Sequence, residues 1–300
     1  MAEAVRLDAP AKVNLRLSIL AREESGFHGL ETVFCALGLA DVVEVRRAAP
    51  GIALAVHGGV DTGPPERNLV VRAAERFHQV LGAEPAVAIR LEKRIPSAAG
   101  LGGGSSDAAA TLRALNVLHD EPFPRAILLQ LAIELGSDVP FFLCGSPLAL
   151  GWSRGERLLA LPPLPERPVL VAHPGVAMPT PEAFRRVAEA RGEYHPQAHA
   201  IDLRALASWQ GVAALAENDF ERDAVEAVPL LEDVRRVMLQ ARAEVAMLSG
   251  SGASYFGVFT DTSYRDSAAA ELADLGVATW RTETRTQEPA PWVDFAGGRG

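Results

Sequence analysis

A glycine-rich stretch in the first third of the chain has the composition of an anion-binding loop. Residues 96–106 read PSAAGLGGGSS, with four glycines in the five positions 100–104. Glycine has no Cβ, so such a backbone can close on a ligand. Four apolar residues then recur at helical spacing: Ala108, Leu112, Leu115 and Leu118. A loop that runs into a helix presents free amides at the positive helix end. A flexible linker seldom runs directly into an amphipathic helix, so we expect residues 96–106 to bind a chain of phosphates.

The loop departs from two common phosphate-binding motifs. No Gly-Lys-Ser/Thr closes it, as a Walker A motif requires. A dinucleotide fingerprint would have its third glycine near Ser105, and the strand expected before the loop, over residues 87–91, leads to a proline. The type of phosphate loop therefore has to be decided with other parts of the chain.

A strand near the N-terminus carries two polar residues that could act together. Residues 11–19 alternate, with apolar side chains on one face and Lys12, Asn14, Arg16 and Ser18 on the other. This period of two predicts a half-buried strand on which Lys12 and Asn14 point the same way. Taken alone, Lys12 is most simply interpreted as a solvated strand lysine.

An aspartate stands at a sharp change of structure in the middle of the chain. A helix is expected to open at Pro124, to bury a stripe from Leu128 to Leu135 and to end at Gly136. Residues 137–142 then read SDVPFF, and Pro140 is expected to keep Val139 extended. Asp138 would thus occupy a bend, where an aspartate can simply make a turn hydrogen bond.

The remaining pattern predicts two domains. In the first half, Asn68 is expected to cap a helix that Gly82 ends. Four prolines between residues 158 and 168 indicate a domain boundary. The later expected elements are a strand at 169–172, a helix after 179–181, helices within 201–242, strands at 243–248 and 255–259 around the glycine turn 249–254, a helix at 263–275 and a strand at 279–284. This order resembles β-α-β-β-α-β, and residues 287–300, rich in Pro and Gly, are expected to form a loose tail.

Composition excludes several classes of function. The 300 residues can bury a core in one large or two modest domains. A net charge of −9 argues against a nucleic-acid surface, although a local loop can still be positive. The two cysteines, Cys35 and Cys144, form no CxxC pair and suit a reducing cytoplasm. No apolar run reaches membrane-spanning length, so we expect a cytoplasmic protein without a membrane partner.

Three separated segments resemble motifs of the GHMP small-molecule kinases, in the order of that family. They are PAKVNL at residues 10–15, the glycine loop 96–106 and SGSGAS at residues 249–254. The segment SDVPFF at residues 137–142 resembles the family's catalytic aspartate segment. Gly26-Phe27-His28 resembles the cytidine-recognising loop of the branch that acts on a cytidine-diphosphate-linked polyol, with Phe27 where a tyrosine is common.

The resemblance implies a role for each matching residue. Lys12 and Asp138 would be catalytic. The ATP-binding residues would be Asn68, Lys93, Pro96, Ala99, Gly100, Leu101, Gly102, Gly103, Gly104, Ser105 and Ser106, and for Asn68 a capping role alone is an equal alternative. The substrate-binding residues would be Asn14, Phe27, His28, Phe184, Gly250, Ser251 and Gly252. Phe27 and Phe184 would stack on cytosine and His28 would hydrogen-bond its edge, although a core phenylalanine is nearly as good an interpretation of Phe184.

The resemblance also implies the fold and the reaction. The fold would be α+β, with residues 1–165 forming an ATP-binding N-terminal domain like domain 2 of ribosomal protein S5, and residues 166–286 forming a ferredoxin-like C-terminal domain at the substrate site. The reaction would be ATP-dependent phosphorylation of the 2-hydroxyl of 4-diphosphocytidyl-2-C-methyl-D-erythritol by a monomer or homodimer. Mg²⁺ would arrive with ATP, with Ser105 or Ser106 as indirect ligands and no protein carboxylates. The alternatives are a homoserine, mevalonate or sugar kinase, or a non-catalytic ligand-binding member of the fold.

Overall fold

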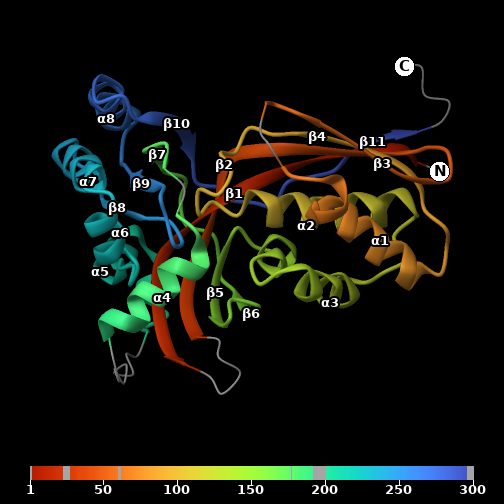
Figure 1. Ribbon diagram of the computed structural model, residues 1–300, viewed down its shortest axis with the longest axis horizontal. Helices are drawn as coiled ribbons and strands as arrows, with labels where there is room; N and C mark the ends of the chain where they lie inside the picture. Colours follow the sequence, from red (N-terminus) through yellow and green to blue (C-terminus); the bar gives the residue numbers. More distant parts are fainter. Residues whose placement is uncertain (1, 23–27, 60–61, 177, 192–200, 296–300) are drawn as a thin grey trace.

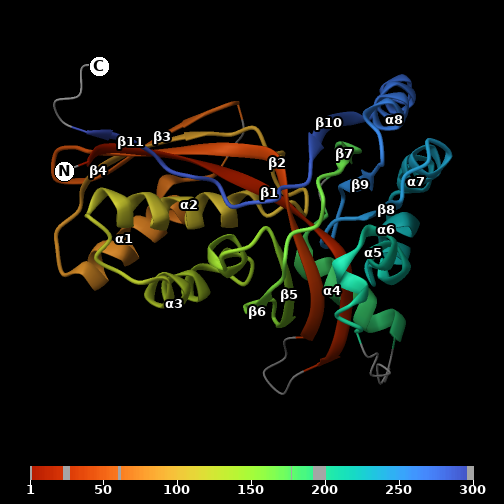
Figure 2. The same ribbon diagram turned by 180° about the vertical axis from the view of Figure 1, so that it is seen from behind.

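The structure, a computed structural model, describes residues 2–22, 28–59, 62–176, 178–191 and 201–295. It is built on two β-sheets (Figures 1 and 2). The strands of the larger sheet are β1 (Ala2–Arg22), β2 (His28–Arg47), β3 (Gly51–His57), β4 (Ala86–Glu92), β5 (Leu148–Ser153), β6 (Arg157–Ala160) and β11 (Trp292–Phe295). Their order is β11-β1-β2-β4-β3, with β5 also on β2 and β6 on β5. The pair β3–β4 is parallel, and the other described pairs are antiparallel.

The second half forms a four-stranded antiparallel sheet with helices. Its strands are β7 (Pro168–His173), β8 (Val245–Leu248), β9 (Tyr255–Val258) and β10 (Ala278–Glu283), in the order β10-β7-β9-β8. Its helices are α4 (Thr180–Arg191), α5 (Trp209–Leu215), α6 (Glu221–Ala227), α7 (Leu230–Gln240) and α8 (Thr262–Asp274), with the 3₁₀ turn η3 (Ala205–Ala207). The sequence of elements is the predicted β-α-β-β-α-β, and the α+β class is confirmed.

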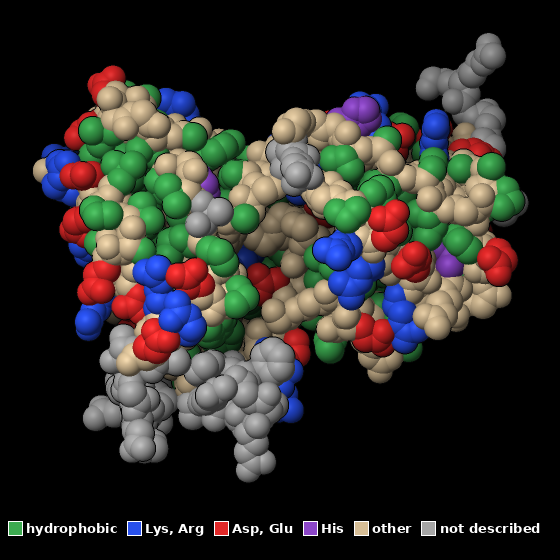
Figure 3. Space-filling view, viewed as in Figure 1, with side chains coloured by type: hydrophobic (Ala, Val, Ile, Leu, Met, Phe, Trp, Pro, Cys, Tyr) green, Lys and Arg blue, Asp and Glu red, His purple; other side chains and the backbone are tan. Residues whose placement is uncertain are grey.

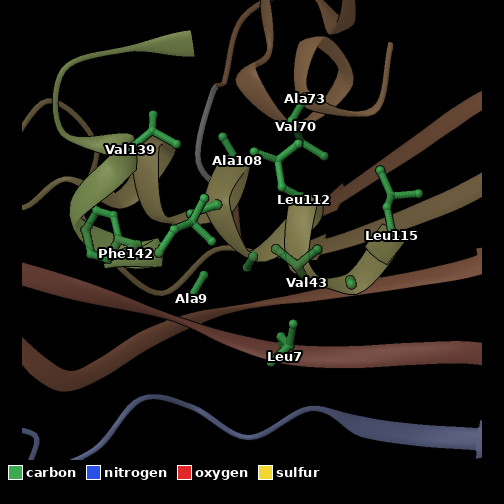
Figure 4. Close-up of a cluster of buried hydrophobic side chains, with 14 of the residues drawn as sticks. Leu7, Ala9, Val43, Val70, Ala73, Ala108, Leu112, Leu115, Val139 and Phe142 are labelled. Carbon is green, nitrogen blue, oxygen red and sulfur yellow. The ribbon is translucent and has the colours of Figure 1, made fainter. Parts of the chain in front are cut away.

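Three helices lie against one face of the larger sheet (Figure 1). They are α1 (Leu69–Leu81), α2 (Gly103–Leu118) and α3 (Arg125–Leu135), with the 3₁₀ turns η1 (Pro65–Arg67) and η2 (Val139–Leu143). As predicted, the Asn68 side chain caps α1 by accepting from Val70 N, and Gly82 ends it in the left-handed region. Figure 4 shows the stripe of α2, with Leu112 and Leu115, packed into the core that it shares with the sheet and α1. No helix among the described residues is long and apolar enough to cross a membrane.

Strands β1 and β2 are long enough to serve both halves of the molecule. The apolar face of β1, including Val13 and Leu15, lies in a core shared with Val171 of β7 and Phe256 of β9. The prediction of a half-buried β1 is wrong, because the polar face is covered as well. Its members Lys12 and Asn14 are 4% and 1% exposed, since the glycine loop packs against Lys12 and the β8–β9 turn lies over Asn14. Because both faces of β1 are buried, the polar side chains of Lys12 and Asn14 lie inside the protein.

Two local predictions are also wrong. Val139 is not extended, because it begins the 3₁₀ turn η2 with Pro140 in the first turn, where a proline needs no amide partner. The segment 287–300 is not a loose tail throughout. Its residues 292–295 form β11, which pairs with the edge of β1, and Arg113 donates to Pro289 O at 2.9 Å. The chain therefore returns to the first sheet after completing the second.

Candidate active site

A cavity of about 910 Å³ lies between the two halves of the molecule. In the space-filling view the surface is hollowed at this place (Figure 3). Its wall includes nine of the predicted site residues: Lys12, Asn14, Gly100, Gly102, Ser105, Asp138, Phe184, Gly250 and Ser251. These residues come from β1, the glycine loop, the turn before η2, α4 and the β8–β9 turn, so the fold brings the separated motifs to one place.

The two predicted catalytic side chains meet in this wall. Lys12 Nζ lies 3.4 Å from Asp138 Oδ2, and the Asp138 side chain remains 31% exposed while that of Lys12 is 5% exposed. Lys12 Nζ also stands 5.5 Å from the centroid of the Phe34 ring, which favours a cation. A buried ammonium beside a carboxylate that still opens to the cavity can stabilise negative charge while the carboxylate accepts a proton.

A hydrogen-bonded network fixes Lys12 from behind. Lys12 Nζ donates to Asn14 Oδ1 at 2.8 Å, and the amide of Gly250 donates to the same oxygen at 2.9 Å. The other end of the Asn14 amide donates to Thr32 Oγ1 at 2.7 Å, and Thr32 donates to Arg16 O at 2.8 Å. Each polar atom of Asn14 therefore has a partner, and its amide can adopt one orientation only.

The glycine loop packs so closely on its neighbours that positions 100 and 102 have no room for a side chain. A Cβ at Gly102 would lie 2.9 Å from Lys12 Cγ, and one at Gly100 would collide with the carbonyl of Ser249. Helix α2 makes its first internal hydrogen bond from Ser106 N to Gly102 O, at 2.9 Å. The amides of the turn before Ser106 are thus left for a ligand, at the positive end of a sixteen-residue helix.

The other predicted ATP-binding residues lie around this loop rather than in the cavity wall. The side chains of Ala99 and Leu101 are buried in the core between the sheets, and the Leu101 carbonyl accepts from Lys12 N at 2.9 Å. These two residues anchor the loop. Pro96, Gly103, Gly104 and Ser106 complete it, and the buried Ser106 Oγ has no hydrogen-bond partner in the described part of the chain.

Lys93 is engaged in a buried charge cluster beneath the loop. Its ammonium pairs with Asp41 and, at 2.7 Å, with Asp107. Burial alone would lower the pKa of Lys93, but the two carboxylates raise it above its ordinary value. Burial raises the pKa of the Asp107 carboxyl to about 8, although the Lys93 ammonium acts in the opposite direction. Asp41 Oδ1 also accepts from Ile95 N at 2.8 Å, so the cluster ties the strand that enters the loop to the helix that leaves it.

The predicted substrate residues are only partly placed. Phe184 on α4 lines the cavity and packs edge-on against Phe220, with ring centroids 4.9 Å apart. Phe27 lies outside the described residues, and His28 is described only as the first residue of β2. Gly252 is in the same turn as Gly250 and Ser251 but does not line the cavity.

Several polar residues at the site escaped sequence reasoning. Asp41, Asp107, Thr32 and Thr180 were not singled out as site residues by type or spacing, although all lie within one or two contacts of the predicted ones. The signal for Asp41 was weak: a single acid within an apolar run. Thr180 Oγ1 lies 2.9 Å from Ser251 Oγ, a contact between distant segments that no local pattern contains.

Comparison with known proteins agrees with this geometry. Residues 68–146 match the family described as GHMP kinases N terminal domain, and residues 199–278 match the one described as GHMP kinases C terminal. A relative from Deinococcus radiodurans named 4-diphosphocytidyl-2-C-methyl-D-erythritol kinase is 37% identical over 97% of this chain and 95% of its own. The chain belongs to the GHMP kinase family.

Solved structures of other GHMP kinases share the fold. A crystal structure of 4-(cytidine 5'-diphospho)-2C-methyl-D-erythritol kinase matches with a TM-score of 0.78 and 36% identity, covering 93% of this chain and 98% of that one. A homoserine kinase from Cytophaga hutchinsonii matches with a TM-score of 0.75 over 98% of both chains, but at 22% identity this likeness concerns the fold alone. As a GHMP kinase, the protein is an ATP-dependent small-molecule kinase.

Proposed function

We propose that this GHMP kinase transfers the γ-phosphate of ATP to the 2-hydroxyl of 4-diphosphocytidyl-2-C-methyl-D-erythritol, a step of non-mevalonate isoprenoid synthesis. The observation that carries the chemistry is the Lys12–Asp138 pair, 3.4 Å apart in the wall of a cavity that the glycine loop also borders. The choice of acceptor is supported by the names of the relatives that match almost the whole chain.

In this proposal each residue has a defined part in the transfer. Asp138 accepts the proton of the 2-hydroxyl, the oxygen forms its bond to the γ-phosphorus, and the bond to the β–γ bridging oxygen breaks to release ADP. Lys12 stabilises the negative charge that develops on the attacking oxygen. The amides before Ser106 bind the phosphate oxygens, and their fixed positions mean that no reorganisation is needed as charge moves.

Mg²⁺ fits the site as a companion of the triphosphate. When bound, it would neutralise phosphate charge and orient the γ-phosphate. The buried Ser106 Oγ, which lacks a described partner, is suited to hold a phosphate oxygen or a metal-bound water, with Ser105 beside it in the cavity wall. No group of three or more His, Cys, Asp or Glu side chains able to hold a metal occurs among the described residues.

Recognition of the cytidine end is assigned to three residues. Phe184 presents its ring in the cavity wall, packed edge-on against Phe220, which also lines the cavity, and stacking on cytosine needs such a fixed aromatic face. Phe27 and His28 are proposed as the second ring and the hydrogen-bonding group on the strength of their motif. We assign the protein to the cytoplasm, which the free thiols of Cys35 and Cys144 support.

A panel of acceptors tests the proposal. ADP release is measured by a coupled assay with the cytidine-linked polyol, mevalonate, homoserine and galactose, each at several concentrations with ATP and Mg²⁺. We expect turnover with the cytidine-linked polyol and background rates with the other three. Turnover only with an acceptor that lacks cytosine would overturn the assignment of the substrate, and no turnover with any of them would favour a binding protein.

A further inference from the structure

The side chain of Asn218 forms a bridge between two parts of the chain that meet at the site. It is 8% exposed, and Nδ2 donates to both Leu248 O and Gly250 O, each at 2.9 Å, while Oδ1 accepts from Phe220 N at 3.0 Å. We propose that Asn218 is a positioning residue for phosphoryl transfer, which holds the β8–β9 turn so that Gly250 orients Asn14 and, through it, Lys12. This role rests on the proposed kinase reaction and concerns a residue that does not touch the reactants.

The turn that Asn218 holds contacts both halves of the catalytic machinery. Gly250 N donates to Asn14 Oδ1, the oxygen that also accepts from Lys12 Nζ. One residue earlier, Ser249 Oγ donates to Gly100 O at 3.0 Å, in the glycine loop. Ser249 keeps this separate contact with the glycine loop, so loss of the Asn218 amide is expected to act on Lys12 through Gly250 and Asn14.

The backbone of Asn218 is fixed to the same strand that carries Lys12. Leu17 N donates to Glu217 O at 2.8 Å, and Asp219 N donates to Leu17 O at 3.0 Å. The contacts thus form a closed ring: β1 holds residues 217–219, Asn218 holds Gly250, and Gly250 holds Asn14 on β1 again. Such a ring fixes the distance between its members more firmly than any single hydrogen bond, because each link restrains the others.

Only an asparagine satisfies all of these contacts. The two hydrogens of Nδ2 face two carbonyls, so an aspartate would set an oxygen against both, and an alanine would leave them without this donor. The turn has little room to adjust, because Gly250 has φ of +57° and a Cβ there would lie 3.1 Å from Gly100 O. Loss of the Asn218 amide should therefore loosen the turn rather than let another group replace it.

A double-mutant cycle tests the link. We compare kcat, KM for ATP and KM for the acceptor in wild type, Asn218→Ala, Asn14→Ala and the double variant. We expect Asn218→Ala to lower kcat about 10- to 100-fold with KM values within about threefold, because small misplacements of reacting groups are costly. If Asn218 acts through Asn14, the double variant should have a kcat within about threefold of Asn14→Ala alone.

Asn116→Ala is the matched control for lost hydrogen bonds. Asn116 is 7% exposed and also bridges backbone atoms, donating to Phe123 O at 3.0 Å and accepting from Phe123 N at 3.1 Å, outside the wall of the active-site cavity. It should lower the melting temperature as Asn218→Ala does and leave kcat within about twofold of wild type. The positioning role would be refuted if Asn116→Ala lowered kcat as much as Asn218→Ala does. It would also be refuted if the fall in kcat of the double variant were the product of the falls in Asn218→Ala and Asn14→Ala.

A crystal structure of the Asn218→Ala variant without substrate tests directly whether Asn218 positions Asn14 and Lys12. We expect Gly250 N to leave Asn14 Oδ1 and Lys12 Nζ to move, and an unchanged network would refute the inference even if the acceptor is wrongly assigned. Asn218→Asp, of the same size, replaces the alanine variant if that one does not fold. The rates of the wild-type protein with the panel of acceptors test the proposed function separately. A failure of the positioning role can therefore be distinguished from a failure of the proposed function.

Discussion

Replacing Asp138 by asparagine isolates its role as a base. The amide has the same size and can still contact Lys12, but it cannot take a proton from the acceptor hydroxyl. A positioned general base contributes about 10²- to 10⁴-fold to a rate, so kcat should fall by that factor, or about 3 to 5 kcal/mol in the activation free energy. The fold should change little, since Asp138 is 31% exposed, the asparagine oxygen can still accept from Lys12, and Asn14 keeps its own hydrogen bond to that ammonium.

The assay separates lost chemistry from lost binding. ADP release gives kcat, and titration with a fluorescent ATP analogue gives the affinity for nucleotide, which we expect to stay within about threefold. Glu244→Gln is a matched control, because Glu244 is 28% exposed and pairs with Arg167 Nε at 3.0 Å, outside the cavity wall. It should retain wild-type kcat. A near-wild-type rate in Asp138→Asn would remove Asp138 from the mechanism.

Three further predictions follow from particular residues. His28→Ala should raise KM for the cytidine-linked acceptor at least about tenfold more than KM for ATP, by steady-state kinetics; equal effects would mean that His28 does not read the base. Gly100→Ala should abolish nucleotide binding in calorimetry, because the added Cβ would collide with Ser249 O. Gly276→Ala is the control, because Gly276 has the same φ of +74° but open space around it, and this variant should bind nucleotide normally. Normal binding by both variants would contradict the loop geometry. Burial raises the pKa of the Asp107 carboxyl above its value in the unfolded chain, so the folded state binds this proton more tightly and the group's contribution to stability declines as the pH rises. Asp107→Asn should therefore lose less stability than wild type from pH 5 to pH 8 in urea unfolding, and parallel losses would refute the shifted pKa.

Local patterns in the sequence predicted most of the elements. The cap Asn68, the stop Gly82 and the apolar stripe of α2 are each encoded within a few residues, and the structure confirms them. The failures concern long-range contacts. β11 pairs with a strand about 290 residues away, and segments distant in the chain cover the polar face of β1, so no periodicity could reveal either.

The site was predictable as a set of motifs but not as a network. Lys12 and Asp138 were identified by their flanking residues, and the structure places them in contact. Thr32, which accepts from Asn14, and Asn218, which donates to Gly250 O, are polar residues of ordinary type whose contacts arise only when distant segments pack together. The same applies to Lys93, whose side chain is occupied by two carboxylates that no spacing rule relates to it.

The central claim is that the glycine loop holds the triphosphate while Lys12 and Asp138 meet the acceptor hydroxyl. The most direct test is a crystal structure of the protein with a non-hydrolysable ATP analogue, Mg²⁺ and the cytidine-linked polyol. We predict the γ-phosphate at the amides before Ser106 and the 2-hydroxyl within about 3.2 Å of an Asp138 carboxylate oxygen, the reach of a general base. A triphosphate bound elsewhere, or a 2-hydroxyl directed away from Asp138, would contradict this account.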